Sequence, residues 1–292
     1  MPLAVPGGFV GVDIFFVISG YLITRILLRE LSTTGSISLA GFWARRAWRI
    51  LPAATIVLVA TAIATALVMP SMEQVELGTS VQAAARFVEN WRLISQEVDY
   101  LSREAEPSAV MHYWSLAVEE QFYLVWPVAL LAFAALGRAI AHKDTDTRFL
   151  FIVLACLWLI SFGLSIFYTS LLKPFAFFGT STRIWQLLSG ALLAFFAAAS
   201  VTFRPRVQSI MILVGLGALL ASVRLITSDT PYPGWVALLP TAAACCLIAF
   251  GGGDGSTRNT GRLLTLAPLT YIGRLSYSWY LWHWPFLLWL YF

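Results

Sequence analysis

The stretch FLFIVLACLWLISFGLSIFYTS, residues 149–170, contains no charged side chain and is long enough to cross a lipid bilayer. A helix of about 20 apolar residues spans the hydrocarbon core. Seven further blocks of similar character follow or precede it, so that the eight predicted spans are 9–28, 50–69, 116–136, 149–170, 183–200, 208–226, 235–250 and 271–290. We therefore predict an all-α, polytopic transmembrane helical bundle that forms a single domain over residues 1–292.

The composition excludes other classes of protein. Hydrophobic residues make up 59% of the sequence and charged residues only 12%, whereas a soluble domain carries about 25% charged residues. The net charge of +4 does not indicate a nucleic-acid partner, because the arginines lie in the gaps between apolar blocks and form no single stripe. The cysteines Cys156, Cys245 and Cys246 fall within apolar blocks, and the sequence shows no metal-ligand spacing and no disulfide framework. We expect neither a metal ion nor a bound cofactor.

The basic residues predict how the chain is oriented in the bilayer. With the first span starting outside, the inner loops carry twelve lysines and arginines and the outer loops carry five. Cytoplasmic loops are normally the basic ones. Residues 70–115 then lie outside, and the helical pattern at 79–96, interrupted by charged residues, indicates an interfacial or re-entrant helix. The expected location is the cell membrane (plasma or inner membrane), which the chain crosses many times.

The two ends of the sequence suggest a fragment. A first span that starts outside normally needs an upstream span or a signal sequence, and residues 1–8 contain neither a basic nor an apolar leader region. The chain stops at Phe292 directly after an apolar block. We therefore expect a truncation before residue 1 and a further truncation after Phe292.

Two charged residues lie at the outer ends of predicted spans. Asp13 lies within GGFVGVDIFFVISGYLIT, residues 7–24, and an intramembrane carboxylate is by default a functional candidate. The small residues Gly11, Ser19 and Gly20 of this segment favour close helix contact. Arg183 lies at an outer helix start, where a cation opposes the helix dipole, so we predict an acidic or hydroxyl-rich partner.

A basic motif, FWARRAWRILP, covers residues 42–52. Arg46 and Arg49 are three residues apart and share one helical face at the inner membrane surface. Paired guanidinium groups suit the capture of phosphates. They could equally bind lipid headgroups or simply follow the positive-inside rule, and the spacing alone favours these two simpler interpretations.

The segment HYWSLAVEEQFYLVWP, residues 112–127, carries the strongest functional signal. Ser115, Glu119 and Tyr123 recur every four residues and line one face of a helix. Carboxylates at a helix start also gain from the helix dipole. Two acids, a glutamine and a tyrosine exceed that requirement, so we favour a functional role for this polar face.

Near the end of the chain, SYSWYLWHWP covers residues 276–285. Its tryptophans are typical of an aromatic belt, whereas His283 lies well inside the last predicted span. A membrane histidine either bonds to a neighbour or takes part in catalysis.

Taken in order, these segments resemble the acyltransferase-3 family of integral membrane acyltransferases, which includes O-antigen and peptidoglycan O-acetylases. The strongest matches are residues 15–20 (FFVISG), the Arg-x-x-Arg pair, and Ser115-Leu116-x-x-Glu119-x-x-Phe122-Tyr123. The resemblance covers nearly the whole chain. It implies the transfer of an acyl group, often acetyl, from a cytoplasmic acyl-CoA donor to a hydroxyl of an extracytoplasmic carbohydrate.

The resemblance also implies roles for single residues. Arg46 and Arg49 would contact acyl-CoA, and Glu119 would orient the acceptor or a catalytic histidine, for which His283 is the candidate. The remaining polar candidates would line the polar cavity or contact the acceptor: Asp13, Ser115, Tyr123 and Arg183. Family members carry an earlier span with an arginine and a catalytic histidine, and none of His112, His142 and His283 occupies that position. Many relatives also continue into a lipase-like extracytoplasmic domain, which would follow Phe292.

Two other functions fit the same residues. A transporter or flippase for a lipid-linked or acylated substrate explains polar side chains inside spans, although the sequence shows no internal repeat of the kind common in transporters. A non-catalytic membrane scaffold predicts that Glu119 and Arg46 tolerate substitution.

Overall fold

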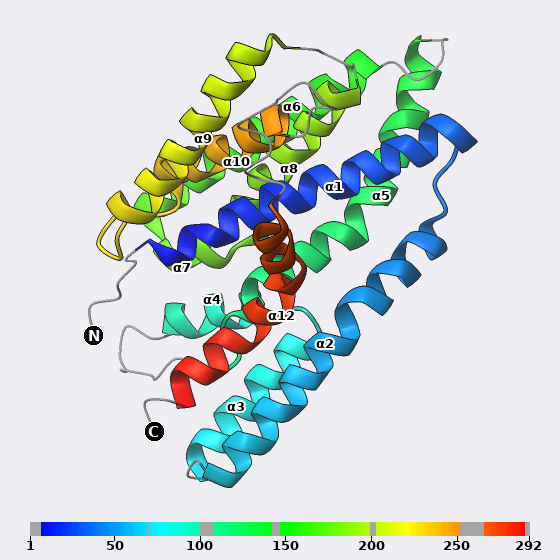
Figure 1. The fold of residues 1–292 in the computed structure, drawn as a ribbon. Helices are drawn as coiled ribbons and strands as arrows, with labels where there is room; N and C mark the ends of the chain where they lie inside the picture. The colour runs from blue at the N-terminus through cyan, green and yellow to red at the C-terminus, as the bar shows by residue number, and fades with distance from the viewer. Residues whose placement is uncertain are drawn as a thin grey trace. The chain divides into compact units, whose positions relative to one another are not determined.

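The computed structural model describes residues 7–68, 71–99, 108–141, 147–198, 203–251 and 266–289. His142, the basic residues 143, 258 and 262, and both chain ends lie outside these ranges. Within them, every regular element is helical, which confirms the predicted all-α class (Figure 1). The helices are α1 Gly11–Thr34, α2 Leu39–Val68, α3 Ser71–Ala85, α4 Glu89–Asp99, α5 Tyr113–Ala141, α6 Thr147–Leu171, α7 Lys173–Phe178, α8 Thr180–Ala198, α9 Pro205–Leu225, α10 Leu238–Gly251 and α12 Ala267–Trp289, with short 3-10 turns at η1 Gly8–Val10 and η2 Gly234–Ala237.

Six helical segments are long and apolar enough to cross a membrane: Gly8–Thr34, Leu39–Leu67, Tyr113–Gly137, Arg148–Leu171, Pro205–Leu225 and Gly234–Gly251. They coincide with six of the eight predicted spans. The other two predicted spans, 183–200 and 271–290, coincide with α8 and α12, which are not among the six. The chain is therefore a membrane protein with at least six helices suited to lipid, and a count of eight stays a prediction.

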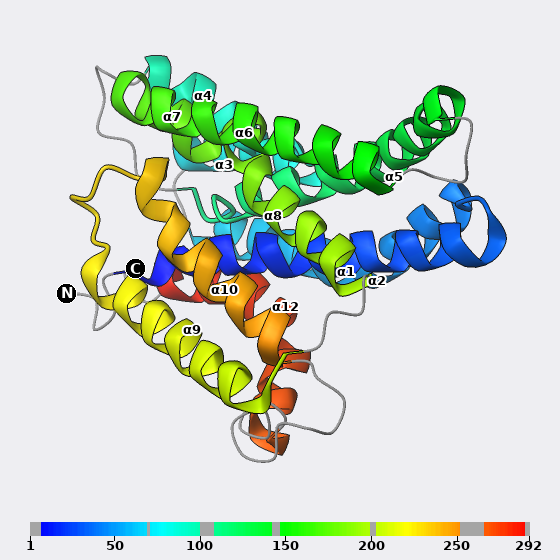
Figure 2. The same ribbon diagram turned by 90° about the horizontal axis from the view of Figure 1, so that it is seen from above.

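The chain divides into two compact units. Unit 1 consists of residues 1–37, 126–177 and 181–269, and unit 2 of residues 38–125, 178–180 and 270–292. In unit 1, α9 packs against α10 and α10 against α1 (Figures 1 and 2). In unit 2, α2 packs against α3 and α3 against α4.

Within unit 1, α1 and α8 cross with their backbones in contact. A Cβ atom added to Gly20 would lie 1.9 Å from the carbonyl oxygen of Leu187, and one added to Gly190 would lie 2.0 Å from that of Val17. Only glycine fits at both points. The predicted close approach at Gly20 is therefore confirmed, whereas a Cβ on Gly11 meets nothing within 4 Å.

In unit 2, the prediction of a single helix over 79–96 is wrong, because α3 ends and α4 begins within this range. Phe87 adopts a left-handed backbone conformation, with φ of 55°, and this ends α3 before α4 begins. Two charged residues of α4 pair within the helix: Arg92 donates to both oxygens of Glu89 at 2.8 and 2.9 Å. Burial raises the pKa of Glu89, and the Arg92 guanidinium opposes that rise.

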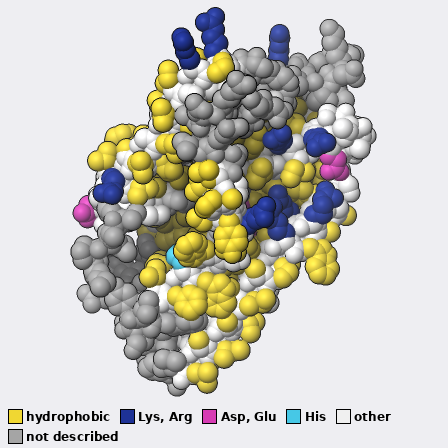
Figure 3. Space-filling model, in the orientation of Figure 1, with side chains coloured by type: hydrophobic (Ala, Val, Ile, Leu, Met, Phe, Trp, Pro, Cys, Tyr) yellow, Lys and Arg dark blue, Asp and Glu magenta, His cyan; other side chains and the backbone are white. Residues whose placement is uncertain are grey.

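The helices present much apolar surface to their surroundings. On α2, Ile56 is 61% exposed and Leu67 81% exposed. Figure 3 shows hydrophobic side chains over much of the described surface on one face of the molecule. Water disfavours exposed apolar patches of this extent, and the hydrocarbon of a bilayer does not.

Candidate functional site

A fully buried polar cluster lies in unit 1, between the start of α1, α8 and the loop before η2. Asp13 has no exposed surface. Its Oδ1 accepts a hydrogen bond from Arg183 at 2.9 Å and another from the Gln186 side chain, and its Oδ2 accepts one from the Tyr232 hydroxyl. The carboxylate therefore has three donors from two distant parts of the chain.

Arg183 is held on all sides. Its Nε donates to the carbonyl of Phe177 at 2.9 Å, and its guanidinium lies 4.9 Å from the centre of the Phe177 ring and 5.3 Å from that of Tyr232. The acidic or hydroxyl partner predicted for Arg183 is thus present in both forms, as Asp13 and Tyr232. A buried charge is tolerated when it is paired and hydrogen-bonded, and this pair is both.

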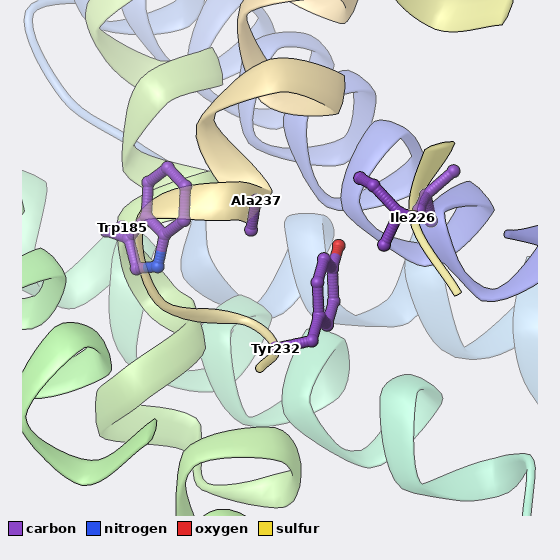
Figure 4. Packing of buried hydrophobic residues seen from close by; sticks show 5 residues of the cluster. Trp185, Ile226, Tyr232 and Ala237 are labelled. Carbon is purple, nitrogen blue, oxygen red and sulfur yellow. The ribbon is translucent and has the colours of Figure 1, made fainter. Parts of the chain in front are cut away.

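The Tyr232 ring belongs to the hydrophobic core of unit 1, beside Trp185, Ile226 and Ala237 (Figure 4). Burial, reinforced by the Asp13 carboxylate, raises the pKa of Tyr232 well above its ordinary value. The hydroxyl therefore keeps its proton and donates a hydrogen bond to Asp13. No motif in the sequence indicates Tyr232, because it lies in a loop that is distant along the chain from both Asp13 and Arg183.

A second polar cluster lies in unit 2, along the first turns of α5. The Tyr123 hydroxyl donates to Glu119 Oε1, four residues earlier on the same face. The Arg46 guanidinium of α2 lies 5.1 Å from the centre of the Tyr123 ring. Arg46 also interacts electrostatically with Glu119 and Glu120. The polar face predicted for α5 therefore exists, and it meets the basic motif of α2.

The two arginines of that motif differ in their surroundings. Arg46 is half-buried against the Tyr123 ring, whereas Arg49 is exposed. Both lie on α2, with Trp43 donating its indole N–H to the Tyr123 carbonyl at 3.1 Å. This indole bond fixes the basic motif against α5.

Above Glu119 on the same face, hydroxyl groups join α5 to α12. Ser115 Oγ lies 2.5 Å from the Tyr280 hydroxyl, which donates to the carbonyl of His112 at 2.7 Å. The Trp284 indole donates to the Ser108 carbonyl at 2.9 Å. No sequence pattern indicated Tyr280, although it lies within SYSWYLWHWP, three residues before His283.

Two imidazoles lie at this end of the cluster. His283 Nδ1 lies 2.5 Å from the carbonyl oxygen of Tyr280, and since a carbonyl only accepts, Nδ1 carries the hydrogen; in the neutral imidazole the lone pair is then at Nε2. The ring centres of His112 and His283 are 5.5 Å apart. His112 is buried and close to the backbone of Leu281, yet within the described residues neither ring nitrogen makes a hydrogen bond of good geometry.

The charge state of His112 follows from this environment. Burial and the neighbouring His283 lower the pKa of His112 to about 3. The imidazole is therefore neutral at physiological pH. A buried, neutral histidine without a good partner is an exception that calls for an explanation.

A third set of polar residues in unit 2 is scaffold. Gln121 donates to the Phe87 carbonyl at 2.8 Å and to Asn90 Oδ1 at 3.0 Å. Asn90 in turn donates to Phe178 and Thr180, and the Thr180 hydroxyl returns a hydrogen bond to Gln121 at 2.5 Å. These hydrogen bonds satisfy the side chains of Asn90, Gln121 and Thr180 and join α4 and α5 to the start of α8.

The structure thus brings the predicted site residues together in two separate groups. Unit 2 gathers those of the polar face of α5 and its neighbours: Arg46, Arg49, Ser115, Glu119, Tyr123 and His283. Unit 1 holds Asp13 and Arg183, joined to each other. Their roles in catalysis, donor binding or acceptor binding stay predictions.

The fold and this site define a helical membrane protein that carries carboxylate, hydroxyl, guanidinium and imidazole groups on one polar face of unit 2. The chain belongs to the acyltransferase-3 family, whose model, described as an acyltransferase domain, matches residues 3–292. The family resemblance inferred from the ordered motifs is therefore confirmed, and it places the chain among acyltransferases.

The chain is similar to curated O-acetyltransferases. It is 33% identical over 285 residues to the peptidoglycan O-acetyltransferase OatA of Listeria monocytogenes, covering 96% of this chain and 45% of that protein. It is 37% identical over 290 residues to the O-acetyltransferase OatA of Staphylococcus aureus, covering 96% of this chain and 46% of that protein. The chain thus spans less than half the length of these relatives. No solved structure matches it.

Proposed function

We propose that the protein is a multi-pass O-acyltransferase of the inner membrane, with eight spans. In this proposal it moves an acyl group from cytoplasmic acyl-CoA to a hydroxyl of an extracytoplasmic carbohydrate of the cell envelope. The observation that carries the proposal is the polar face of unit 2. Arg46 contacts Tyr123, which donates to Glu119; one turn earlier on the same face, Ser115 contacts Tyr280, which in turn contacts His283. Glu119 links the two sets by its electrostatic interaction with Tyr280.

The lower end of this face suits the donor. Arg46 and Arg49 lie on α2, at the membrane surface predicted to be cytoplasmic, and guanidinium groups bind phosphates in a bidentate manner. The phosphates of CoA supply such a partner. Glu119 and Glu120 lie within electrostatic reach of Arg46, so an anionic donor would compete with them for the guanidinium.

The upper end suits the transfer. The overall step breaks the carbon–sulfur bond of the thioester and forms a carbon–oxygen bond to the acceptor, and the hydroxyl proton ends on the thiol. His283 presents a lone pair at Nε2 because its Nδ1 faces the Tyr280 carbonyl. In our proposal this nitrogen takes the hydroxyl proton as general base, and Glu119 holds the network that orients it.

The acceptor follows from the relatives. The Listeria protein is named for peptidoglycan, and a peptidoglycan sugar hydroxyl is the acceptor we propose here. No cofactor takes part, and acyl-CoA acts as a substrate.

The direct test uses the purified protein in lipid nanodiscs with acetyl-CoA and soluble peptidoglycan fragments. We expect release of free CoA and acetylated fragments, identified by mass spectrometry, in equal amounts. The absence of both thioester consumption and acylated product would overturn the proposal. Movement of an unmodified fragment or lipid-linked sugar across proteoliposomes would instead support a transporter.

A further inference from the structure

An apolar groove lies between α2 and α3 in unit 2. It encloses about 290 Å³ and is lined by side chains of both helices, with Phe87 and Tyr113 at its edge. Four of its lining residues are alanines: Ala54, Ala62, Ala84 and Ala85. Small residues normally let neighbouring membrane helices close up, but here a space remains whose size is at the lower end of ligand pockets, roughly 300–1,000 Å³.

The groove continues along α2. A second cavity of about 230 Å³ shares Ala62 and Val81 with the first and extends to Ala66 and Gln74. The two cavities therefore follow α2 from Leu51 to Ala66, over four turns of one helix. An elongated apolar space of this form fits a hydrocarbon chain.

The position of the groove relates it to the candidate site. Along α2, Arg46 and Arg49 come first and the groove begins at Leu51, directly after them. Tyr113 lines the groove and donates its hydroxyl to the Ala54 carbonyl at 2.8 Å. The Tyr113 ring centre lies 4.8 Å from that of His112, at the imidazole end of the polar face. In unit 2 the groove therefore begins next to the basic residues of α2 and meets the imidazole end of the polar face at Tyr113.

We infer that this groove holds the hydrocarbon chain of the acyl donor, so that the enzyme transfers acyl groups longer than acetyl. The inference rests on the proposed function and names its donor class. With the CoA phosphates at the arginines and the thioester at the polar face, the acyl chain points along α2 between the alanines. Transfer breaks the thioester carbon–sulfur bond and makes the ester carbon–oxygen bond, and the chain itself stays intact.

A donor series tests this inference on the unaltered protein. Acetyl-, butyryl-, hexanoyl- and octanoyl-CoA are compared in nanodiscs with the same carbohydrate acceptor, and kcat/KM is measured for each. We expect hexanoyl or octanoyl transfer to exceed acetyl transfer at least tenfold. Transfer of acetyl alone would overturn the inference and leave the proposed function standing. Transfer from none of the four would overturn the proposed function as well.

Two matched variants test whether the acyl chain lies in this groove. Ala62 lines both cavities, whereas Ala60, two residues earlier on α2 and also partly buried, lines neither. We expect Ala62→Phe to lower kcat/KM for octanoyl-CoA at least tenfold more than for acetyl-CoA, and Ala60→Phe to keep the wild-type ratio. An equal loss for all donors in Ala62→Phe would overturn the inference. The donor series on the wild type decides the matter if Ala62→Phe does not fold.

Discussion

The two buried polar clusters of this protein contain similar groups and differ in how completely those groups are satisfied. In unit 1, the Asp13 carboxylate receives three donors, and Arg183 is bonded to it, to a carbonyl and to two rings. In unit 2, titratable groups at the start of α5 lack a good partner among the described residues, namely both nitrogens of His112 and Oε1 of Glu120, whereas in the unit 1 cluster the group without a partner is the neutral amide oxygen of Gln186. An ion pair whose hydrogen-bonding groups are already satisfied has little capacity to bind a ligand, whereas unsatisfied groups can still bind one. We therefore expect the unit 1 cluster to stabilise the fold and the unit 2 face to take part in the reaction.

The largest expected effect breaks the closed cluster. Asp13→Ala leaves the Arg183 guanidinium buried without its counter-ion, which costs about 3–5 kcal/mol of folding stability. Thermal unfolding of the detergent-solubilised protein, followed by circular dichroism, measures this loss. In the double variant Asp13→Leu with Arg183→Met, most of the stability should return, because no charge stays buried. A melting temperature of Asp13→Ala equal to that of the wild type would show that the pair is not structural.

The second prediction concerns the open face. Glu119→Gln removes the charge next to Arg46 and Tyr123 while keeping the size of the side chain, so acyl transfer should fall about 100-fold. The melting temperature should change little, because the amide oxygen still accepts from Tyr123. Measuring transfer and unfolding on the same preparation separates the two effects. Loss of stability without loss of transfer would place this face with the architecture.

The third prediction concerns the helix crossing that supports the closed cluster. In Gly20→Ala, the new methyl group would lie 1.9 Å from the carbonyl oxygen of Leu187, so α1 and α8 must separate. Overpacking of this kind costs about 1–3 kcal/mol. Gly11→Ala, on the same helix but with nothing within 4 Å of its Cβ, is the matched control and should melt as the wild type does. Equal melting of both variants would contradict the crossing.

The last prediction concerns the pH dependence of His112, whose effect is absent at neutral pH and develops only in acid. Its pKa is about 3 in the folded protein, since burial and His283 disfavour the proton, against about 6.5 in an unfolded chain. The unfolded state therefore binds the proton first as pH falls. Below pH ~6.5 the folded state should lose about 1.4 kcal/mol of stability per pH unit from this residue, down to pH ~3. His112→Phe removes the titrating group. The melting temperature of the variant relative to that of the wild type should therefore rise as the pH falls from 7 to 4. A constant difference would contradict the lowered pKa.

Periodicity and composition alone determined the class of this protein. Blocks of about 20 apolar residues leave only a membrane bundle, because hydrocarbon accepts no unpaired backbone groups. The repeat of Ser115, Glu119 and Tyr123 also sufficed to predict one polar helical face, since such a repeat is local and a helix fixes it. The ordered motifs were enough to find the family.

Only the tertiary structure decided which distant residues meet. Tyr232 reaches Asp13 from more than two hundred positions away, and Tyr280 reaches Ser115 across 165. No local pattern encodes such pairings, because they depend on how whole helices pack. The same holds for the break at Phe87 and for the groove along α2. The backbone angle at Phe87 and the space between α2 and α3 both result from many contacts together, so no single residue in the sequence predicts them.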